Sequence, residues 1–384
     1  MKLLRLTFFA ISALFLTSCQ NKDASTSNNN LNTALNTQGD NVAASAAMKP
    51  WEIGPFTKID SLNPVLTPDP SVLFLDPVNN EEVAWEGRNV LNPSAVVKGG
   101  KVYLIYRAQD EKMTSRIGLA ISEDGLHFKK QAAPIFYPKN DEALKYEQLG
   151  GAEDPRVVQG PNGLYILTYT AYDGKTARLC LATSTDLMQW TKYGPVLSDP
   201  KYIDLWSKSG AIVVAQQGSE MRAKKIDGKY WMYFGDTNLF MAHSEDLIHW
   251  EVLENKENKK MMSVLHPRPG YFDSRLVEPG PYALWTDKGI NLIYNGSNAA
   301  NNNDPDLPIY TYAAGQALFD AQRPYKILDR TAGYFIFPDK DYEKVGEVNE
   351  VCFVEGLVYF KEQWFLYYGT GDSKIAVATA PYKR

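Results

Sequence analysis

The sequence has few of the residues that build zinc sites or disulfide frameworks, with three Cys and four His among 384 residues. It also lacks an excess of positive charge, because 40 Lys and Arg stand against 45 Asp and Glu. The net charge of -5 gives no basic surface of the kind that nucleic-acid-binding proteins present. Carboxylates and aromatic residues are abundant, with 23 Tyr, 16 Phe and 8 Trp. We therefore expect any catalysis to rest on Asp and Glu.

The beginning of the chain has the pattern of an export signal. Lys2 and Arg5 precede an apolar run from Leu6 to Leu16, which is shorter than the roughly 20 residues of a membrane-spanning helix. The run ends in Leu16-Thr17-Ser18-Cys19, which resembles a bacterial lipobox, in which the Cys is acylated and becomes the mature N-terminus. An ordinary cleaved signal with a chance Cys is the alternative.

Composition divides the chain into three parts. Residues 1–18 are the predicted signal peptide, residues 19–50 are a tether rich in Asn, Ser, Ala and Thr, and residues 51–384 are the predicted folded part. The resemblance to a lipobox implies an exported protein that is lipid-anchored through Cys19 to the bacterial outer membrane. We expect contact with the membrane through that lipid only.

The folded part repeats a short β-rich unit. β-branched and aromatic runs alternate with Gly, Asn and Asp turns, and no long amphipathic helical pattern occurs. Self-comparison finds five copies, which start near positions 92, 154, 210, 278 and 350. Five four-stranded units around a channel predict an all-β fold, a five-bladed β-propeller. A β-sandwich with an extra domain is the alternative, and the segment from Ile59 to Leu75 is predicted to add a strand to the last blade.

Polar residues gather at the starts of the repeats. Because the innermost strand of each blade begins near one mouth of the channel, these starts are expected to converge on a concave polar site. Strand-entry caps and turns are the alternative explanation for the same residue types. The starts read Asn92-Pro-Ser, Glu153-Asp154-Pro-Arg156, Lys208-Ser-Gly, Val277-Glu278-Pro and Asn349-Glu350-Val.

Several of these motifs resemble those of glycoside hydrolase family 130. The motifs are Gly151-Ala-Glu-Asp-Pro-Arg156, Asn92-Pro-Ser, Tyr106-Arg107-Ala108, the Asp-Leu-x-x-Trp repeats, and Tyr367-Tyr-Gly369 with Asp372. The family comprises β-mannoside phosphorylases and related β-mannosidases on a five-bladed propeller, and the likeness runs from about residue 86 to residue 380. The resemblance implies that Asp154 is the general acid. It also implies that Asn92, Arg107, Arg156 and Asp372 surround the sugar.

The sequence departs from the phosphorylases of that family where they bind phosphate. A phosphate dianion needs several cationic donors, and the resemblance places an Arg-Asn pair and a His-Arg-Pro segment there. This chain has Lys208-Ser209 and Phe234-Gly235-Asp236 instead. It also carries two additional carboxylates, Glu278 in place of a Gly-rich turn and Glu220 in the third repeat. The pattern resembles the hydrolytic branch, whose members act on β-1,2-mannosides.

An inverting hydrolase needs an acid and a base roughly 6.5–9.5 Å apart. We assign Asp154 as the acid and Glu220 and Glu278 as base and water-positioning partner, in an order left open, with Lys208 as a substrate-binding residue. The resemblance implies that Asp154 transfers its proton through a sugar hydroxyl, and the acid is expected to stay protonated near neutral pH. The predicted function is hydrolysis of β-mannosides, with β-1,2 as the expected linkage.

Two other functions remain open at this point. One is a β-mannoside phosphorylase that produces mannose 1-phosphate, and the other is a non-catalytic lipoprotein that binds glycans at the surface. In every case the expected partner is a mannose-containing oligosaccharide, with no nucleic acid, no cofactor and no metal motif. Cys180 and Cys352 are predicted to be buried free thiols, and the four His are not expected to be catalytic. Three Trp serve either as sugar-stacking faces or as core: Trp85, Trp206 and Trp285.

Overall fold

The computed structural model describes residues 48–382. The predicted signal peptide, the lipidation site Cys19 and nearly all of the predicted tether lie outside these residues. Within them the chain is almost entirely β-structure, as predicted. The helices in the described part are two single turns, α1 (Leu144–Glu147) and α2 (Asp341–Lys344), and a 3-10 turn at Pro161–Gly163. No helix among residues 48–382 has the length and apolar character needed to cross a bilayer.

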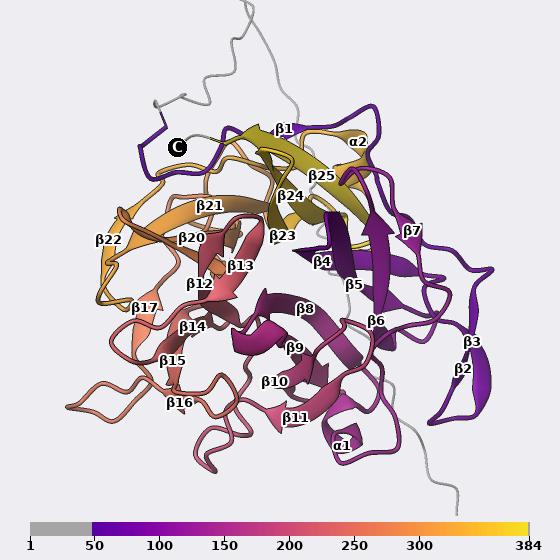
Figure 1. Ribbon diagram of the computed structural model, residues 1–384. Helices are drawn as coiled ribbons and strands as arrows, with labels where there is room; N and C mark the ends of the chain where they lie inside the picture. Colours follow the sequence, from indigo (N-terminus) through magenta and orange to yellow (C-terminus); the bar gives the residue numbers. More distant parts are fainter. Residues whose placement is uncertain (1–47, 383–384) are drawn as a thin grey trace, which may run out of the picture. The chain divides into compact units, whose positions relative to one another are not determined.

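The strands form five successive antiparallel groups, which Figure 1 shows around a common centre. The first group contains β4 (Asn89–Lys98), β5 (Lys101–Gln109), β6 (Ser115–Ser122) and β7 (Lys129–Lys130). The second contains β8 (Gly151–Gln159), β9 (Tyr165–Tyr172), β10 (Ala177–Ser184) and β11 (Thr191–Pro195). The third contains β12 (Ala211–Gln217), β13 (Glu220–Ala223), β14 (Tyr230–Phe234), β15 (Leu239–Ser244), β16 (Glu251–Val252) and β17 (Ser263–Leu265).

The last two groups complete the series. The fourth contains β18 (Leu276–Pro279), β19 (Ala283–Thr286), β20 (Gly289–Ser297), β21 (Tyr312–Phe319) and β22 (Ile327–Arg330). The fifth contains β23 (Cys352–Phe360), β24 (Gln363–Thr370), β25 (Lys374–Pro381) and β1 (Thr57–Lys58). A separate hairpin pairs β2 (Leu73–Asp76) with β3 (Glu81–Ala84).

The start of the described chain completes the fifth group. β1 pairs with β25, and Leu66 makes a further bridge to Ile375. The prediction that an N-terminal segment would add a strand to the last group is therefore confirmed, but the residues of that strand differ from those predicted. The paired strand is residues 57–58, just before the segment predicted from Ile59. Segments near the two ends of the described part thus meet in one sheet, which ties the first and last strands of the fold together.

Turn chemistry explains why the repeated motif recurs. In the first group Asp124 Oδ1 accepts the N–H groups of Leu126 and His127 at 2.8 and 2.9 Å. Asp186 Oδ1 does the same for the two residues that follow its own turn, and so does Asp246 Oδ1. These carboxylates hold the chain as it turns from β6 to β7, from β10 to β11 and from β15 to β16. The repeated Asp is therefore a structural residue at the outer edge.

The core lies between neighbouring groups rather than in one central mass. One buried cluster joins Ile212 and Val214 of β12 to Leu284 of β19 and to Val354 and Leu366 of the fifth group. β-branched and aromatic residues fill both faces of the strands, since each sheet is covered on either side by the next. The inner strands are thereby fixed, and they position the polar residues at the centre.

Candidate functional site

Bulges in the inner strands turn polar side chains away from the sheets. In β4 the pairing passes from Leu91 to Pro93 and omits Asn92. In β8 it passes from Glu153 to Arg156, so that Asp154 is left unpaired. Asn92 and Asp154 have positive φ angles of 45° and 48°, which Asn and Asp tolerate better than most residues. The Asn-Pro and Asp-Pro sequences thus produce the same local geometry in two repeats.

Asp154 is the centre of a buried polar cluster. Its carboxylate is 1% exposed. The Asn92 amide donates a hydrogen bond of 2.8 Å to Asp154 Oδ1, and Arg107 Nη1 donates another of 3.0 Å to the same oxygen. Lys208 Nζ lies 3.3 Å from Asp154 Oδ2. The first and third repeats therefore supply side chains to a single carboxylate of the second.

Lys208 also joins Asp154 to Glu278. Its ammonium lies 3.1 Å from Glu278 Oε1, and the Ser209 hydroxyl donates a hydrogen bond to that same oxygen. Asp154 Oδ2 and Glu278 Oε1 are thus at most about 6.4 Å apart, the sum of their distances to Lys208 Nζ. This upper limit lies just below the carboxylate spacing of inverting enzymes, roughly 6.5–9.5 Å.

Arg156 lies behind these residues and connects the second group to the fourth and fifth. Its Nε and Nη2 donate hydrogen bonds of 2.8 Å to the carbonyls of Gly280 and Pro279, directly after Glu278. Arg156 Nη2 also lies 3.5 Å from Glu355 Oε2. The guanidinium therefore fixes the backbone that carries Glu278.

Glu355 is a central residue that the sequence reasoning missed. That reasoning took Glu350 as the fifth polar position, but Glu350 lies before β23 in a turn that is only partly buried. In β23 the pairing passes from Val354 to Gly356 and omits Glu355, as it omits Asn92 in β4. Glu355 is 1% exposed, and neither of its oxygens has a hydrogen-bond partner among the described residues. The available signal was the interruption of an apolar run by Glu355-Gly356.

Arg107 binds one further carboxylate of the cluster, that of Glu153, and its charge acts on another, that of Asp372. Its Nη2 donates a hydrogen bond of 2.7 Å to Glu153 Oε1. Burial raises the pKa of Glu153, although Arg107 opposes the rise. Burial also raises the pKa of Asp372 to about 6, again against Arg107 and with the Asp154 charge adding to the rise.

The charges of the cluster lower the pKa of Asp154, whereas the sequence led us to expect a protonated acid. Burial disfavours its anion, but Lys208, Arg107 and the Asn92 amide outweigh burial and hold the pKa of Asp154 below its usual range. In this arrangement Asp154 is therefore an anion rather than the protonated acid that was expected. Burial raises the pKa of Glu278, with Lys208 opposing, and raises that of Glu355 well above its usual range, with Arg156 opposing.

Glu220 does not lie with the cluster. It begins β13, where it pairs in register with Gln217 at the far end of β12, and its carboxylate binds Arg222 Nη2 at 2.5 Å. The seven residues of β12 span roughly 23 Å in extended conformation, which separates Glu220 from Ser209. Its assignment as base or water-positioning partner is corrected for that reason. Of the predicted site residues in the described part, the others converge: Asn92, Arg107, Asp154, Arg156, Lys208, Glu278 and Asp372.

Asp236 is a further carboxylate whose charge acts on Lys208. Burial lowers the pKa of Lys208, but Glu278, Asp154, Asp236 and Glu153 more than compensate and raise it well above its usual value. The Gly235 N–H donates to the Lys208 carbonyl at 2.9 Å, which places Asp236 at the entrance of the third group. Trp206 Nε1 donates a hydrogen bond of 2.8 Å to Asp236 Oδ2.

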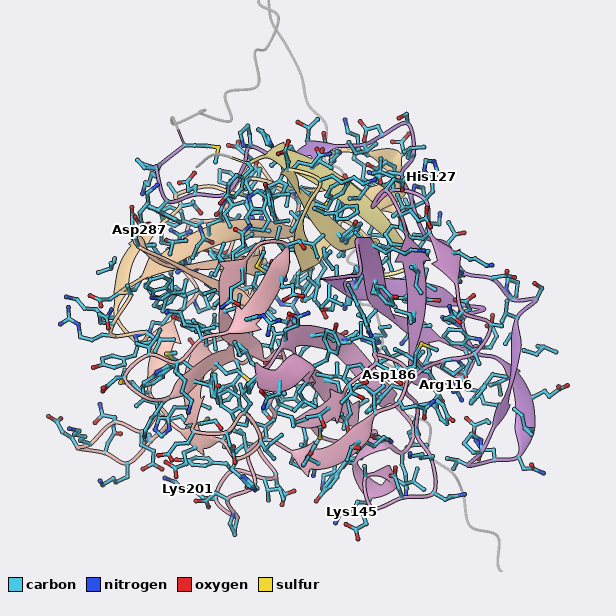
Figure 2. The ribbon with its side chains drawn as sticks, viewed as in Figure 1. Arg116, His127, Lys145, Asp186, Lys201 and Asp287 are labelled. Carbon is cyan, nitrogen blue, oxygen red and sulfur yellow. The ribbon has the colours of Figure 1, made fainter. Side chains whose placement is uncertain are left out.

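The other residues singled out from the sequence have structural roles. Cys180 and Cys352 are buried free thiols, as predicted. Trp85 is fully buried, and Trp285 donates to the Ala321 carbonyl at 3.1 Å. His127 lies at the outer margin of the molecule in Figure 2, where it pairs with Asp124 at 2.8 Å.

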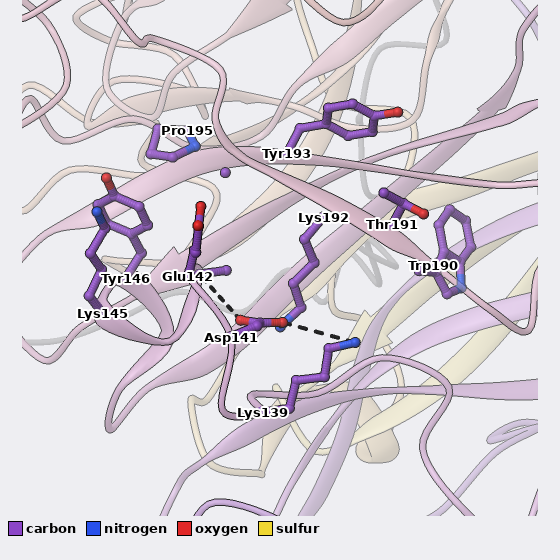
Figure 3. Close-up of a pocket in the computed structure, with 12 residues that line it drawn as sticks. Lys139, Asp141, Glu142, Lys145, Tyr146, Trp190, Thr191, Lys192, Tyr193 and Pro195 are labelled. Carbon is purple, nitrogen blue, oxygen red and sulfur yellow. Dashed lines mark hydrogen bonds and ion pairs between the residues drawn. The ribbon is translucent and has the colours of Figure 1, made fainter.

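A surface pocket lies apart from the central cluster. Figure 3 shows its lining on β11 and around α1, where Lys139 and Asp141 form an ion pair of 4.0 Å. Lys192 is bound there to Glu147 at 2.5 Å, and Tyr169 donates a hydrogen bond to the same carboxylate. These paired charges stabilise the outer part of the second group. Across residues 48–382, no group of three or more His, Cys, Asp or Glu side chains has the arrangement of a metal site.

Comparisons with known proteins agree on one family. A family model described as beta-1,4-mannooligosaccharide phosphorylase, of glycoside hydrolase family 130, matches residues 61–384. The 1,2-beta-oligomannan phosphorylase of Thermoanaerobacter sp. (strain X514) is 30% identical over 313 residues, covering 79% of this chain and 93% of that protein.

Solved structures are more similar in sequence. A glycosyl hydrolase from Bacteroides ovatus is 41% identical with a TM-score of 0.85, covering 88% of this chain and 96% of that one. A second structure is 42% identical with a TM-score of 0.86, over 88% of this chain and 96% of that one. It comes from work on glycoside hydrolases in the GH130 family of mannoside phosphorylases that target beta-1,2 mannosidic linkages in Candida mannan.

Proposed function

The chain belongs to glycoside hydrolase family 130, and from that premise we propose that it hydrolyses β-mannosides, with the β-1,2 linkage as its substrate. Relatives with each activity are similar to it: curated phosphorylases at about 30% identity and a structure from work on β-1,2-mannan hydrolases at 42%. The choice between water and phosphate rests on the charges at the site.

The observation that carries the proposal is the surroundings of Lys208. This ammonium already faces two carboxylates, Asp154 at 3.3 Å and Glu278 at 3.1 Å, and the charge of Asp236 acts on it as well. A phosphate dianion placed there would meet more negative than positive charge in a poorly solvated site, which is costly because like charges repel strongly at low dielectric. Water meets no such penalty, and Glu278 is positioned to bind it.

The proposed reaction is a single displacement. Water attacks the anomeric carbon while Glu278 accepts its proton, and the bond from that carbon to the glycosidic oxygen breaks. The leaving oxygen receives a proton that Asp154 supplies through a sugar hydroxyl. Asn92, Arg107, Arg156 and Asp372 position the mannose ring and the carboxylates. The result is inversion at the anomeric carbon and release of mannose.

The ionised state of Asp154 adds a condition to this scheme. Because Lys208 and Arg107 hold Asp154 as an anion in the free site, a proton has to reach it before the leaving group departs. Burial raises the pKa of Asp372 to about 6, so Asp372 retains a proton at mildly acidic pH while Glu278 acts as the base in its ionised form. We propose that activity declines as the pH rises through the pKa of Asp372.

Three further features are part of the proposal. The five strand groups are proposed to be the blades of a five-bladed β-propeller, because each is a series of antiparallel strands and because β4, β8, β18 and β23 each carry a residue of the cluster. The catalytic domain is proposed to span residues 51–384, after a signal peptide of residues 1–18 and a tether of residues 19–50. Lipid attachment at Cys19 to the outer membrane is proposed from the sequence motif alone.

Variants of the two carboxylates test the assignment. Asp154→Asn and Glu278→Gln are each expected to reduce kcat on β-1,2-mannobiose at least about a thousandfold while leaving the melting temperature near that of the wild type. Glu220→Gln is the matched control, because it makes the same change at a carboxylate on the far side of β12. Wild-type turnover in either active-site variant would refute the assignment. Glycan binding without turnover by the wild-type protein would favour the binding-protein alternative.

A further inference from the structure

One exposed aromatic residue stands beside the central cluster. Trp206 is 53% exposed, whereas Trp85 is fully buried. It lies two residues before Lys208, so its Cα is at most about 7 Å from that of Lys208. Leaving so large an apolar surface in water brings no gain in folding free energy, and it leaves this part of the indole open to a ligand.

The indole ring is held in a fixed orientation. Trp206 Nε1 donates to Asp236 Oδ2 at 2.8 Å, and its ring packs edge-on against Tyr172 with 6.1 Å between ring centres. Tyr172 in turn lies against Gly150, where an added Cβ would come within 2.3 Å of the Tyr172 ring. Any side chain at Gly150 would therefore displace Tyr172 and, with it, the support of Trp206.

The loop that carries Trp206 is anchored on both sides of it. Arg178 donates to the Ile203 carbonyl at 3.0 Å and to the Asp204 carboxylate at 2.8 Å. The Ser207 N–H donates to the Ala177 carbonyl at 3.0 Å. Because these hydrogen bonds hold the loop in place, little conformational entropy would be lost when a ring binds to Trp206.

The surface continues from Trp206 towards the strand of Asp154. Leu149 is 75% exposed and directly precedes Gly150, at the entrance of the second group. Trp206 and Tyr172, together with Leu149, thus form an apolar rim beside the Asp154–Lys208 contact. We define these three residues as the aromatic rim.

We propose that the aromatic rim binds the sugar ring on the leaving-group side of the bond that is cleaved, with the Trp206 face packed against the C–H face of that ring. This inference rests on the proposed function, because it takes the mannose ring at Asp154 as the ring that is released. Sugar rings present apolar C–H faces between their hydroxyls, and an ordered indole face matches such a surface. The Asp236 carboxylate, at the edge of the indole, offers a hydrogen-bond acceptor to the hydroxyls of the same ring.

Two substrates separate rim binding from other effects. β-1,2-Mannobiose has a second ring, whereas β-mannosyl fluoride has none and reacts at the same carbon. Trp206→Ala is expected to lower kcat/KM for the mannobiose roughly tenfold and to leave kcat/KM for the fluoride within about twofold of the wild type. Trp206→Phe, which keeps an aromatic face, is expected to retain most of the activity on both.

A matched control is Tyr193→Ala, which removes another exposed aromatic residue. Tyr193 lies on β11, and its hydroxyl accepts a hydrogen bond from Thr183 of β10. Thr183 is six residues along that strand from Ala177, which contacts the loop of Trp206, so Tyr193 is roughly 20 Å from the rim. Tyr193→Ala should change the kinetics of neither substrate. An equal loss on both substrates in Trp206→Ala, or no loss on either, would overturn the proposal.

Failure of the proposed function would be recognised separately. If the wild-type protein turned over neither substrate, the hydrolase assignment would fail, and calorimetric titration with β-1,2-mannobiose would then decide on the rim. A dissociation constant about tenfold weaker in Trp206→Ala would support it. An unchanged constant, or no binding by the wild-type protein, would overturn it.

Discussion

Asp372 is expected to oppose folding at neutral pH, and replacing it with Asn should stabilise the protein there. Burial and the Asp154 charge raise its pKa in the folded state to about 6, although Arg107 opposes the rise, against an ordinary value of about 3.9. A group whose folded pKa is raised contributes stability that is fully present below about pH 4 and is lost as the pH rises through about 6.

The size of the effect follows from that difference. A shift of about two pKa units corresponds to at most about 3 kcal/mol, and we expect ~1–2 kcal/mol because Asp372 retains some exposure to solvent. Asp372→Asn is neutral at every pH and tolerates the φ of 48° at this position. For a domain of this size the gain is a rise in melting temperature of about 1–3 °C at pH 7.5, with no difference near pH 4.

Thermal unfolding of wild type and variant between pH 4 and pH 8 checks this prediction, with loss of kcat/KM as the accompanying effect on activity. Asp186→Asn is the control with the opposite sign. Backbone N–H groups of Gln189 and Met188 lower the pKa of Asp186, so its removal should lower the melting temperature at pH 7.5. A change in melting temperature for Asp372→Asn that is equal at pH 4 and pH 7.5, or negative at pH 7.5, would refute the reasoning.

Three other predictions concern buried groups. Glu355→Gln should leave the melting temperature at pH 7 within about 2 °C of the wild type, because a neutral acid is exchanged for an amide of the same shape; a large loss would mean that Glu355 is buried as an ion. Arg156→Lys should lower kcat/KM at least about a hundredfold, since Lys cannot reproduce the paired hydrogen bonds to two carbonyls; calorimetric unfolding separates this loss from misfolding, and near-normal activity would contradict the role of Arg156. Cys180 and Cys352 should react with a thiol reagent only after denaturation in a Cys19→Ala variant, because burial raises the pKa of both thiols; rapid labelling of the native protein would contradict their burial.

The convergence of distant residues could be predicted from the sequence because the same local pattern recurs. Asn92-Pro and Asp154-Pro interrupt apolar runs at the start of a strand, and such interruptions in a repeated unit meet at one end of it. Glu355 follows the same rule, as the fourth residue of β23, just as Asn92 and Asp154 are the fourth residues of β4 and β8, but no Pro follows it to mark the site. Its bulge becomes evident only from the pairing with β24.

Other properties of the site depend on distances that a sequence does not contain. Glu220 lies next to Arg222 in the same short strand, and only the length of β12 reveals that it is far from Ser209. The ionised state of Asp154 depends on Lys208, which lies 54 positions away in the sequence and bridges to Glu278 as well. The sequence was enough to predict which polar side chains lie together. The direction of the Asp154 pKa shift could be found only from the distances between them.

The central claim is that water, rather than phosphate, attacks the sugar at a site where carboxylates surround Lys208. It is tested most directly by incubating the protein with β-1,2-mannobiose in 18O-labelled water, with and without inorganic phosphate, and following the products by NMR and mass spectrometry. We predict free mannose that carries one 18O atom at the anomeric carbon and is released as the α-anomer, at a rate that phosphate does not increase. Formation of mannose 1-phosphate only when phosphate is present, with no label entering mannose, would contradict the claim.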